Sequence, residues 1–353
     1  YLAHYTEPKS EEEDEKIMSQ YTAQQVHLKS RPAGMPTHDN FALVTVELPQ
    51  PAAGEVLVKN LYMSVDPYMR GRMREDAVYA QAYAVNEVMY GGAIGEVIES
   101  NDPSLSAGDI VLNQKAWQDR FVAPANTVVK LEPFDRAQLS LYMGTLGMPG
   151  LTSYVGLFKF GEPKAGDTVF VSAASGAVGA NVCQIAKLKG CRVIGSCGSD
   201  EKAQWLKDEC GVDEVINYKT CGDLSAALAA AAPEGIDVYF ENVGGDHLQA
   251  AINSMNPYGR IAACGMISGY NAANLEPGPN NLMLIVGKKI RITGFIVSDH
   301  VDMRDAFLSE MIPWIQAGKI KSHETVVEGI GHAVDAFLGL FSGNNFGKMV
   351  VKL

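Results

Sequence analysis

The sequence has 353 residues, of which 47% are hydrophobic and 20% are charged, with 35 glycines and 16 prolines. The length favours two domains, and the composition excludes collagen-like, coiled-coil and wholly disordered proteins. The net charge of −12 argues against a nucleic-acid or acidic-membrane partner, because most of the surface would repel a polyanion.

Residues 1–17 precede the first apolar pattern and are rich in acidic side chains. Six acids and two lysines give this segment −4 of the net charge of −12. We interpret it as a solvated tail, or as a leader with Met18 as an internal or original start. It has no apolar core and is therefore not a secretory signal.

Between Val26 and Lys130, short stretches of alternating polar and apolar residues are separated by turn residues. This pattern is typical of a β-rich barrel or sandwich. Strands are expected at Phe41–Leu48, Glu55–Tyr62, Gly91–Glu99 and Gly108–Leu112.

From Thr168 onward, apolar strands alternate with helical stretches, including Gly179–Lys189 and Glu201–Cys210. Such alternation predicts a parallel sheet covered by crossover helices. The expected strands are Val169–Ser172, Arg192–Ser196, Asp213–Ile216, Ile236–Glu241, Arg260–Cys264 and Arg291–Val297.

The last segment is expected to hold helices at Met303–Ala317 and Ala333–Phe341 and a closing strand at Lys348–Leu353. A strand after the α/β segment predicts that the chain returns to the first domain. We expect that domain to span 18–143 and 314–353, and the α/β cofactor domain to span 144–313.

Two observations bear on location. The uncharged stretches 137–158 and 168–186 contain glycines, proline or mainly small residues, so neither is expected to span a membrane. All six cysteines lie between Cys183 and Cys264 without C-x-x-C spacing, which favours a reducing, cytoplasmic setting.

The glycine pattern Ala174-x-Gly176-x-x-Gly179 follows one apolar strand and opens a helix. Phosphate oxygens can reach backbone N–H groups only where the turn carries very small side chains, so this context predicts dinucleotide binding. The alternative is a small-residue turn without a ligand. Similar glycines at Gly91 and Gly95 lie among strand residues and are interpreted as packing positions.

The residues after the second strand bear on the choice between NAD and NADP. Gly198 and Ser199 are followed by Asp200, Glu201 and Lys202. Small residues and a nearby lysine favour NADP, whereas Asp200 at the strand tip would favour NAD. A third interpretation makes Asp200 a helix cap and Lys202 a surface charge.

No metal site is expected, because the seven histidines are scattered and none pairs with a cysteine at short spacing. The sequence also has no G-x-S-x-G elbow around Ser175 or Ser196, which argues against a hydrolase. Hydride transfer without metal needs a hydrogen-bond donor and a proton source, and tyrosine can serve as either. The 14 tyrosines leave that choice open.

Several stretches carry a family resemblance that covers about Val26 to Leu353. They are Ser64-Val-Asp-Pro-Tyr-Met-Arg, Leu146-Gly-Met-Pro-Gly-Leu-Thr, Ala173-Ala-Ser-Gly-Ala-Val-Gly, Gly198-Ser-Asp-Glu-Lys, Ile216-Asn-Tyr-Lys, Tyr239-Phe-Glu-Asn-Val-Gly-Gly, Cys264-Gly-Met-Ile-Ser-Gly-Tyr and Asn344-Asn-Phe-Gly-Lys. Together they resemble the zinc-free branch of the medium-chain dehydrogenase/reductase superfamily, which contains prostaglandin reductases, plant alkenal double-bond reductases and bacterial curcumin reductase.

The resemblance implies a GroES-like β-barrel catalytic domain and a Rossmann domain with a doubly wound parallel sheet. It implies an NADPH-dependent enzyme that reduces the carbon–carbon double bond of α,β-unsaturated carbonyl compounds, curcumin-type diarylenones included. Hydride would go to the β-carbon and a proton to the α-carbon. Members of the family commonly form homodimers.

The resemblance also implies site residues. Lys202 and Tyr218 would hold the 2′-phosphate, which favours NADP where the spacing alone left the choice open. The other cofactor residues implied are Met148, Thr152, Gly176, Ala177, Val178, Gly179, Asn242, Cys264, Ile267, Ser268, Tyr270, Phe295, Ile296, Val297 and Asn345.

Tyr270 matches a tyrosine near the nicotinamide ribose, and Tyr68 matches one that faces the substrate. Either of them, or water, would protonate the α-carbon. Tyr79 and Tyr83 lie where agreement with the family is weakest and are candidates for stacking on an aromatic substrate.

Two rival functions stay open. One is a zinc-free NADPH quinone reductase. The other is a non-catalytic NADPH sensor, because a Rossmann site by itself does not show turnover.

Overall fold

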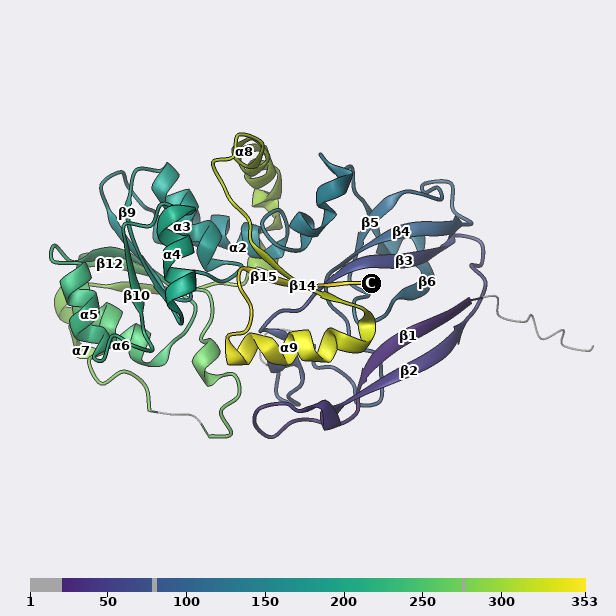
Figure 1. Ribbon diagram of the computed structural model, residues 1–353, viewed down its shortest axis with the longest axis horizontal. Coiled ribbons are helices and arrows are strands. Elements are labelled where there is room, and N and C mark those ends of the chain that lie inside the picture. Colours follow the sequence, from purple (N-terminus) through teal and green to yellow (C-terminus); the bar gives the residue numbers. More distant parts are fainter. Residues whose placement is uncertain (1–20, 78–80, 275–276) are drawn as a thin grey trace, which may run out of the picture.

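The computed structural model describes residues 21–77, 81–274 and 277–353, so the acidic segment 1–17 and Tyr79 lie outside the described residues. Figure 1 shows two lobes, with the C-terminal elements between them. Within the described ranges, no helix combines the length and the apolar character that crossing a bilayer requires.

The first lobe is built on a seven-stranded sheet in the order β14-β15-β3-β4-β5-β7, with β6 also paired to β3. A separate hairpin of β1 and β2 covers it. The bounds are β1 Tyr21–Leu28, β2 Phe41–Leu48, β3 Glu55–Ser64, β4 Ala93–Ser100, β5 Ile110–Asn113, β6 Arg120–Pro124, β7 Val129–Lys130, β14 Glu324–Glu328 and β15 Lys348–Lys352.

The core of this lobe joins distant parts of the chain. The ring of Trp117 stacks on Phe41 with centroids 6.4 Å apart and meets the edge of Phe337 at 5.9 Å. Phe337 belongs to α9 (Ala333–Ser342), which follows the α/β segment in the chain. Because β15 pairs antiparallel with β3 in the same lobe, the return of the chain to the first sheet is observed directly.

The second lobe is a six-stranded sheet in the order β10-β9-β8-β11-β12-β13, and every neighbouring pair is parallel. The bounds are β8 Thr168–Val171, β9 Arg192–Cys197, β10 Glu214–Asn217, β11 Ile236–Glu241, β12 Met255–Ala263 and β13 Arg291–Gly294. In chain order this is 3-2-1-4-5-6, the order of a Rossmann sheet, and it confirms the expected fold class. β13 ends at Gly294, three residues short of the expected strand.

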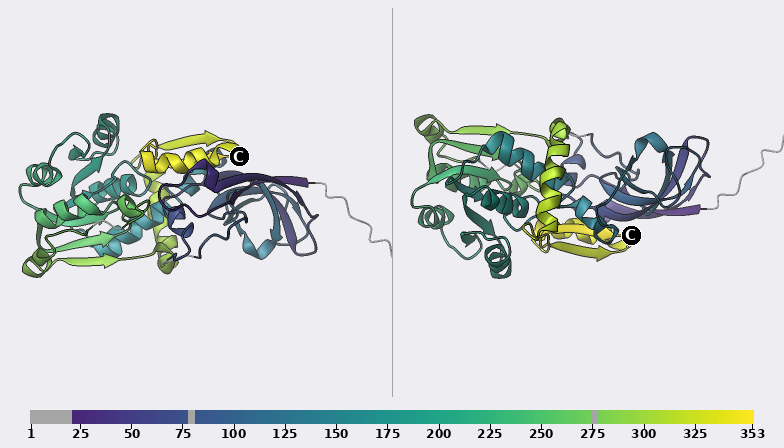
Figure 2. Two further views of the ribbon diagram at one scale, coloured as in Figure 1. Left: turned by 90° about the horizontal axis from the view of Figure 1, so that it is seen from below. Right: turned by 90° about the horizontal axis from the view of Figure 1, so that it is seen from above.

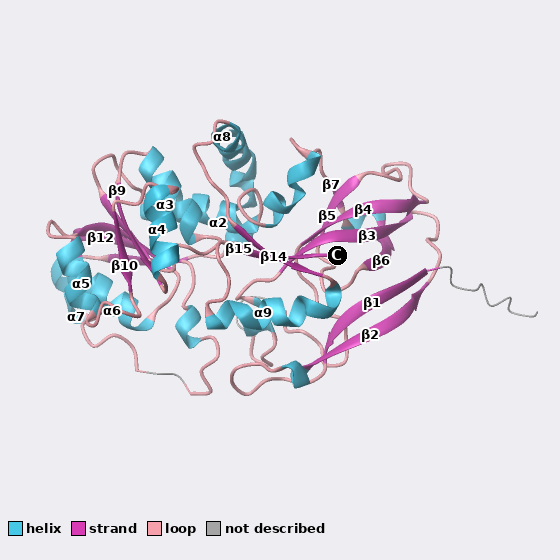
Figure 3. Cartoon of the chain, in the orientation of Figure 1, coloured by secondary structure: helices cyan, strands magenta, loops and turns pink. Residues whose placement is uncertain are grey.

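Helices cover both faces of this sheet, as Figure 3 shows. They are α3 Gly179–Leu188, α4 Asp200–Asp208, α5 Leu224–Ala231, α6 Gly245–Ser254 and α7 Met283–Lys288. Val169, Phe170 and Val171 of the central strand β8 are fully buried, as expected for a strand covered on both faces.

Helical elements between the lobes carry part of the cavity wall. A 3₁₀ segment at Arg136–Met143, kinked at Gln138, leads to α2 (Met148–Val155). α2 continues into a wider helical turn at Gly156–Gly161. A side chain at Gly156 would lie 2.5 Å from the ring of Phe240, so glycine lets the helix approach the sheet. α8 (Arg304–Gln316) packs against α2, and Figure 2 shows it near the junction of the lobes.

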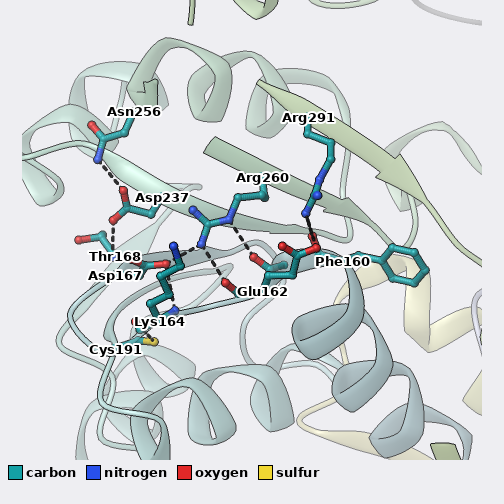
Figure 4. Close-up of polar contacts among 11 residues, drawn as sticks. Phe160, Glu162, Lys164, Asp167, Thr168, Cys191, Asp237, Asn256, Arg260 and Arg291 are labelled. Carbon is teal, nitrogen blue, oxygen red and sulfur yellow. Dashed lines mark hydrogen bonds and ion pairs between the residues drawn. The ribbon is translucent and has the colours of Figure 1, made fainter. Parts of the chain in front are cut away.

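The amino ends of the sheet strands are closed by a polar network, shown in Figure 4. Arg260 donates hydrogen bonds to the carbonyl oxygens of Gly161 and Glu162 and forms an ion pair with Asp167. Asp237 accepts from the backbone N–H of Thr168 and from the Asn256 side chain. Arg260, Asp167 and Asp237 therefore find hydrogen-bond or ion-pair partners within the protein.

Candidate active site

A cavity of 1640 Å³ lies at the carboxyl ends of the Rossmann strands and reaches the first lobe. In open parallel sheets, ligands bind at the point where the strand order reverses, here between β8 and β11. The cavity follows that rule, because Ser175–Gly179 after β8 and Asn242–Gly244 after β11 both line it.

The turn after β8 has the tight geometry that a phosphate-binding turn requires. A side chain at Gly179 would lie 2.3 Å from the carbonyl oxygen of Ala173, and Ala173 itself adopts a positive φ of 48°. This turn leads directly into the amino end of α3, where the helix dipole is favourable for an anion.

Asn242 holds the carboxyl ends of β8 and β11 together. Its side-chain amide donates to the carbonyl oxygen of Ser172, and its backbone N–H donates to the Ser172 hydroxyl. The neighbouring Glu241 is buried, and burial raises the pKa of its carboxyl group. Its Oε1 accepts hydrogen bonds from Tyr239, Val243 and Gly244. The floor of the cavity is thus a fixed polar surface.

Lysine side chains gather at the end of the cavity beyond β9. Ser199, and not Asp200, caps α4 by accepting from the backbone N–H of Lys202, which corrects the interpretation of Asp200 as the cap. Lys202 is half-buried, and its Nζ donates to the carbonyl oxygen of Gly343 at 2.8 Å. Burial lowers the pKa of Lys202, and the charge of Lys219 acts in the same direction. Lys202 is therefore more than a surface charge.

Tyr218 lies beside these lysines. A side chain at Gly198 would come within 2.8 Å of the Tyr218 hydroxyl and 3.2 Å of the Lys219 Cε, so glycine leaves room for both. The Tyr218 ring meets the edge of His247 at 5.3 Å. This end of the cavity combines two cations with a hydroxyl, a set suited to a phosphate group.

Tyr68 and Tyr270 line the other end, where the first lobe closes the cavity. Tyr68 directly precedes the short helix α1 (Met69–Arg72), and Tyr270 follows a 3₁₀ turn at Ile267–Gly269. A side chain at Gly265 would lie 3.0 Å from the Tyr270 hydroxyl, so this loop is packed closely around it.

The structure brings the expected site residues to one cavity, with two exceptions. Its lining includes Tyr68, Met148, Thr152, Gly176, Ala177, Val178, Gly179, Lys202, Tyr218, Asn242, Cys264, Ile267, Ser268, Tyr270, Phe295, Ile296, Val297 and Asn345. Tyr79 lies outside the described residues. Tyr83 does not line the cavity; it is buried in the first lobe, where its hydroxyl donates to the carbonyl oxygen of Tyr90. The role of each lining residue stays a prediction.

Sequence reasoning missed charged residues of the wall, among them Lys219, Asp66 and Lys348. Lys219 follows Tyr218 directly, and its position beside a predicted phosphate residue was an available signal. Asp66 and Lys348 form a buried ion pair at 3.0 Å, and no local pattern joins residues so far apart in the chain.

Cys264 lies in the wall, where burial raises the pKa of its thiol to about 12. A thiol with that pKa is neutral near pH 7 and unsuited to act as a nucleophile. Across the described ranges, no three His, Cys, Asp or Glu side chains are grouped so that they could hold a metal ion. The hydroxyl groups of Tyr68 and Tyr270 are acid–base groups among the residues that line the cavity.

Two family models match the chain. Residues 24–131 match the N-terminal domain of oxidoreductase, and residues 177–316 match zinc-binding dehydrogenase.

Individual relatives match almost the whole chain. A 2-alkenal reductase (NADP⁺-dependent) of Nicotiana tabacum is 46% identical, covering 93% of this chain and 96% of its own. The NADPH-dependent curcumin reductase of Escherichia coli is 41% identical, covering 92% and 95%. The crystal structure of CurA from Vibrio vulnificus in complex with NADPH is 43% identical with a TM-score of 0.88, covering 93% and 98%.

Proposed function

The chain belongs to the medium-chain dehydrogenase/reductase family that contains NADP-dependent alkenal and curcumin reductases, and from this premise we propose that it reduces the carbon–carbon double bond of α,β-unsaturated carbonyl compounds with NADPH. One observation carries the proposal. A continuous cavity runs from Lys202 and Tyr218, past the glycine turn, to Tyr68 and Tyr270.

The residues that line the cavity fit NADPH. Ala173 has a positive φ, and Gly179 lies close to the carbonyl oxygen of Ala173. The turn before α3 is therefore tight enough for a pyrophosphate to approach its backbone. Lys202 and Lys219 provide positive charge for a ribose phosphate, in a chain whose net charge is −12. When bound, NADPH supplies the hydride that adds to the β-carbon of the substrate.

The side chains of this protein supply the rest of the chemistry. A hydrogen-bond donor at the substrate oxygen supports the negative charge that develops there during hydride addition. Tyr68 and Tyr270 both line the cavity, and their hydroxyl groups can serve as donor and proton source, the proton going to the α-carbon directly or through water. No covalent intermediate is needed.

A substrate panel tests this function. Short enals, long diarylenones and quinones are supplied with NADPH, its consumption is followed by absorbance, and products are identified by mass spectrometry. Saturated carbonyl products from enals or enones are expected. Turnover of quinones alone would replace the proposal with a quinone reductase, and tight NADPH binding without turnover of any compound would favour a sensor.

We further propose a homodimer, formed through the edge of the Rossmann sheet. β13 is the last strand of that sheet, and exposed apolar side chains occur in it and in the segments before and after it in the chain: Met283, Val286, Ile292 and Val301. An unpaired strand edge beside an apolar patch suits a second copy of the same chain, because a two-fold axis would pair the same surface with itself. Val286→Asp should convert a dimer into a monomer in light scattering, and a monomeric parent protein would contradict the proposal.

A reducing compartment such as the cytoplasm is the proposed location. Cysteines 183, 191, 197, 210, 221 and 264 are all free, and burial raises the pKa of Cys183, Cys191 and Cys210, so these thiols are chemically inert. Fractionation of cells that express the protein tests this location.

A further inference from the structure

Lys348 and Asp66 form an ion pair inside the wall of the cavity. Both residues are buried, with 4% and 5% of their surface exposed. Lys348 Nζ donates to Asp66 Oδ1 at 3.0 Å and to the carbonyl oxygen of Val65 at 2.8 Å, while Asp66 Oδ2 accepts from the Ser64 hydroxyl. Met349, Val350 and Val351, which follow Lys348 in β15, are buried and apolar, so a charge at position 348 needs a reason beyond packing.

The pair fixes the segment that carries Tyr68. Asp66 is held through its side chain by Lys348, and its carbonyl oxygen accepts from the backbone N–H of Met69 at 3.1 Å. Pro67, which has a restricted φ, and Tyr68 lie between these two contacts. The backbone of Tyr68 therefore has little freedom to shift.

The other side of Lys348 is tied to the cofactor turn. Gly347 donates its backbone N–H to the carbonyl oxygen of Ser175 and forms a bridge with Gly176. A side chain at Gly347 would lie 1.8 Å from the carbonyl oxygen of His323, and its φ is 65°, so glycine is required. Residues 347–348 thus contact the glycine turn of one lobe and the Tyr68 segment of the other.

We infer that Lys348 is a positioning residue, which through Asp66 sets the place of Tyr68 relative to the dinucleotide turn. A buried ion pair is weak support for stability, because an apolar pair of similar shape often serves as well. The ion pair does fix the relative position of the two side chains, because a buried charged atom is satisfied only where it meets its partner. The role of Tyr68 in this inference rests on the proposed function.

The test uses the neutral pair Asp66→Asn/Lys348→Met, because Lys348→Met alone leaves an unpaired buried carboxylate and is at risk of not folding. Displacing a reacting group by about 1 Å costs about 100-fold in rate, so kcat for an enone should fall roughly 10-fold to 100-fold. The Kd for NADPH, measured by fluorescence, should change less than about 2-fold. Lys352→Met, at an exposed position of the same strand, is the matched control and should leave both unchanged.

The same double substitution made in Tyr68→Phe separates positioning from general loosening. If Lys348 acts through Tyr68, it causes no further fall in kcat in that background. A full further fall, an unchanged kcat in the folded double variant, or an equal loss of NADPH affinity would each overturn the inference.

A spectroscopic measurement works without turnover. With 3-fluorotyrosine at position 68, one sharp ¹⁹F resonance is expected in the parent and a shifted or broadened one in the double variant. An unchanged resonance would also overturn the inference. If the parent turns over no enone but the resonance responds, the proposed function fails while the positioning stands.

Discussion

The amino and carboxyl ends of the Rossmann strands differ in whether their cationic side chains have ion-pair partners. At the amino ends, Arg260 is satisfied by Asp167 and by backbone carbonyl oxygens. At the carboxyl ends, Lys202 and Lys219 lie together on the cavity wall, and the described residues provide neither with an ion-pair partner. The charged groups at the amino ends of the strands therefore stabilise the fold. The lysines at the carboxyl ends leave positive potential there for a ligand.

This difference teaches how to tell a structural charge from a binding charge. A structural cation has its hydrogen bonds filled by the protein, so removing it leaves protein groups unsatisfied. A binding cation lowers the affinity for a ligand when it is removed and leaves the fold intact. Substitutions at the two ends should therefore affect different measurements.

Arg260→Met should have the largest effect on stability. It leaves the Asp167 carboxylate and the carbonyl oxygens of Gly161 and Glu162 without their donor, and we expect a loss of about 3 kcal/mol in the free energy of unfolding. Urea denaturation measures it. The KM for NADPH should not change; a rise in KM would mean that the two ends are not independent.

Arg291→Met is the control for that change. Arg291 pairs with Glu162 in the same network, but both side chains are about half exposed. The expected loss is at most about 0.5 kcal/mol.

Tyr270→Phe should have the largest effect on catalysis at the carboxyl end. Losing a positioned proton donor lowers rates by about 100-fold or more, and kcat should fall while the Kd for NADPH and the unfolding curve stay close to the parent. Stopped-flow kinetics at saturating NADPH measures the chemical step. Full retention of kcat would remove this hydroxyl from the proton path.

Lys202→Ala should raise the KM for NADPH by about 10-fold or more, because a charged hydrogen bond to phosphate contributes roughly 1.5 to 3 kcal/mol. The KM for the enone should change far less. Calorimetric binding of 2′,5′-ADP and 5′-AMP gives the same comparison without turnover, and only the former should weaken. Lys207→Ala, in the last turn of α4, is the matched control.

His247 gives the carboxyl end a dependence on pH. Burial lowers the pKa of His247 from 6.5 to about 4. The folded protein keeps the ring neutral, whereas the unfolded chain takes up a proton below pH 6.5. Stability is therefore fully present above pH 6.5 and is lost as the pH falls toward 4, by about 1 to 2 kcal/mol at pH 5.

His247→Leu should remove that part of the acid destabilisation. The Nε2 atom of His247 is buried without a hydrogen-bond partner in the described chain, so leucine leaves no group newly unsatisfied. Urea midpoints of parent and variant at pH 7.5 and pH 5 make the comparison. Equal losses in both proteins would contradict the lowered pKa.

The sequence predicted the sheets better than the elements that join them. β8 is wholly buried, and β9 and β11 are buried at all but one residue each, as expected for short strands of a parallel sheet covered on both faces. The connecting segment contains a 3₁₀ turn, an α-helix and a wider turn. The wider turn depends on the packing of Gly156 against Phe240, which local sequence does not reveal.

Part of the candidate site could likewise be predicted from local sequence, and part of it depends on the fold. The glycine turn could be identified from its position after a strand and before a helix. The pairing of Lys202 with Tyr218 came from a family resemblance, and the hydrogen bond of Lys202 to Gly343 depends on where the folded chain places the residue that follows α9. The Lys348–Asp66 pair joins residues 282 positions apart, and only the folded chain brings them together.

That separation has a consequence for how the protein is made. β15 pairs with the Tyr62–Ser64 end of β3, and the ribosome synthesises β3 well before β15. At about 5 to 20 residues per second, extending the chain by the 282 positions from Asp66 to Lys348 takes about 14 to 56 seconds. The Rossmann lobe can fold during that interval while one edge of β3 stays open to wrong partners. The lobe that is begun first is therefore completed last.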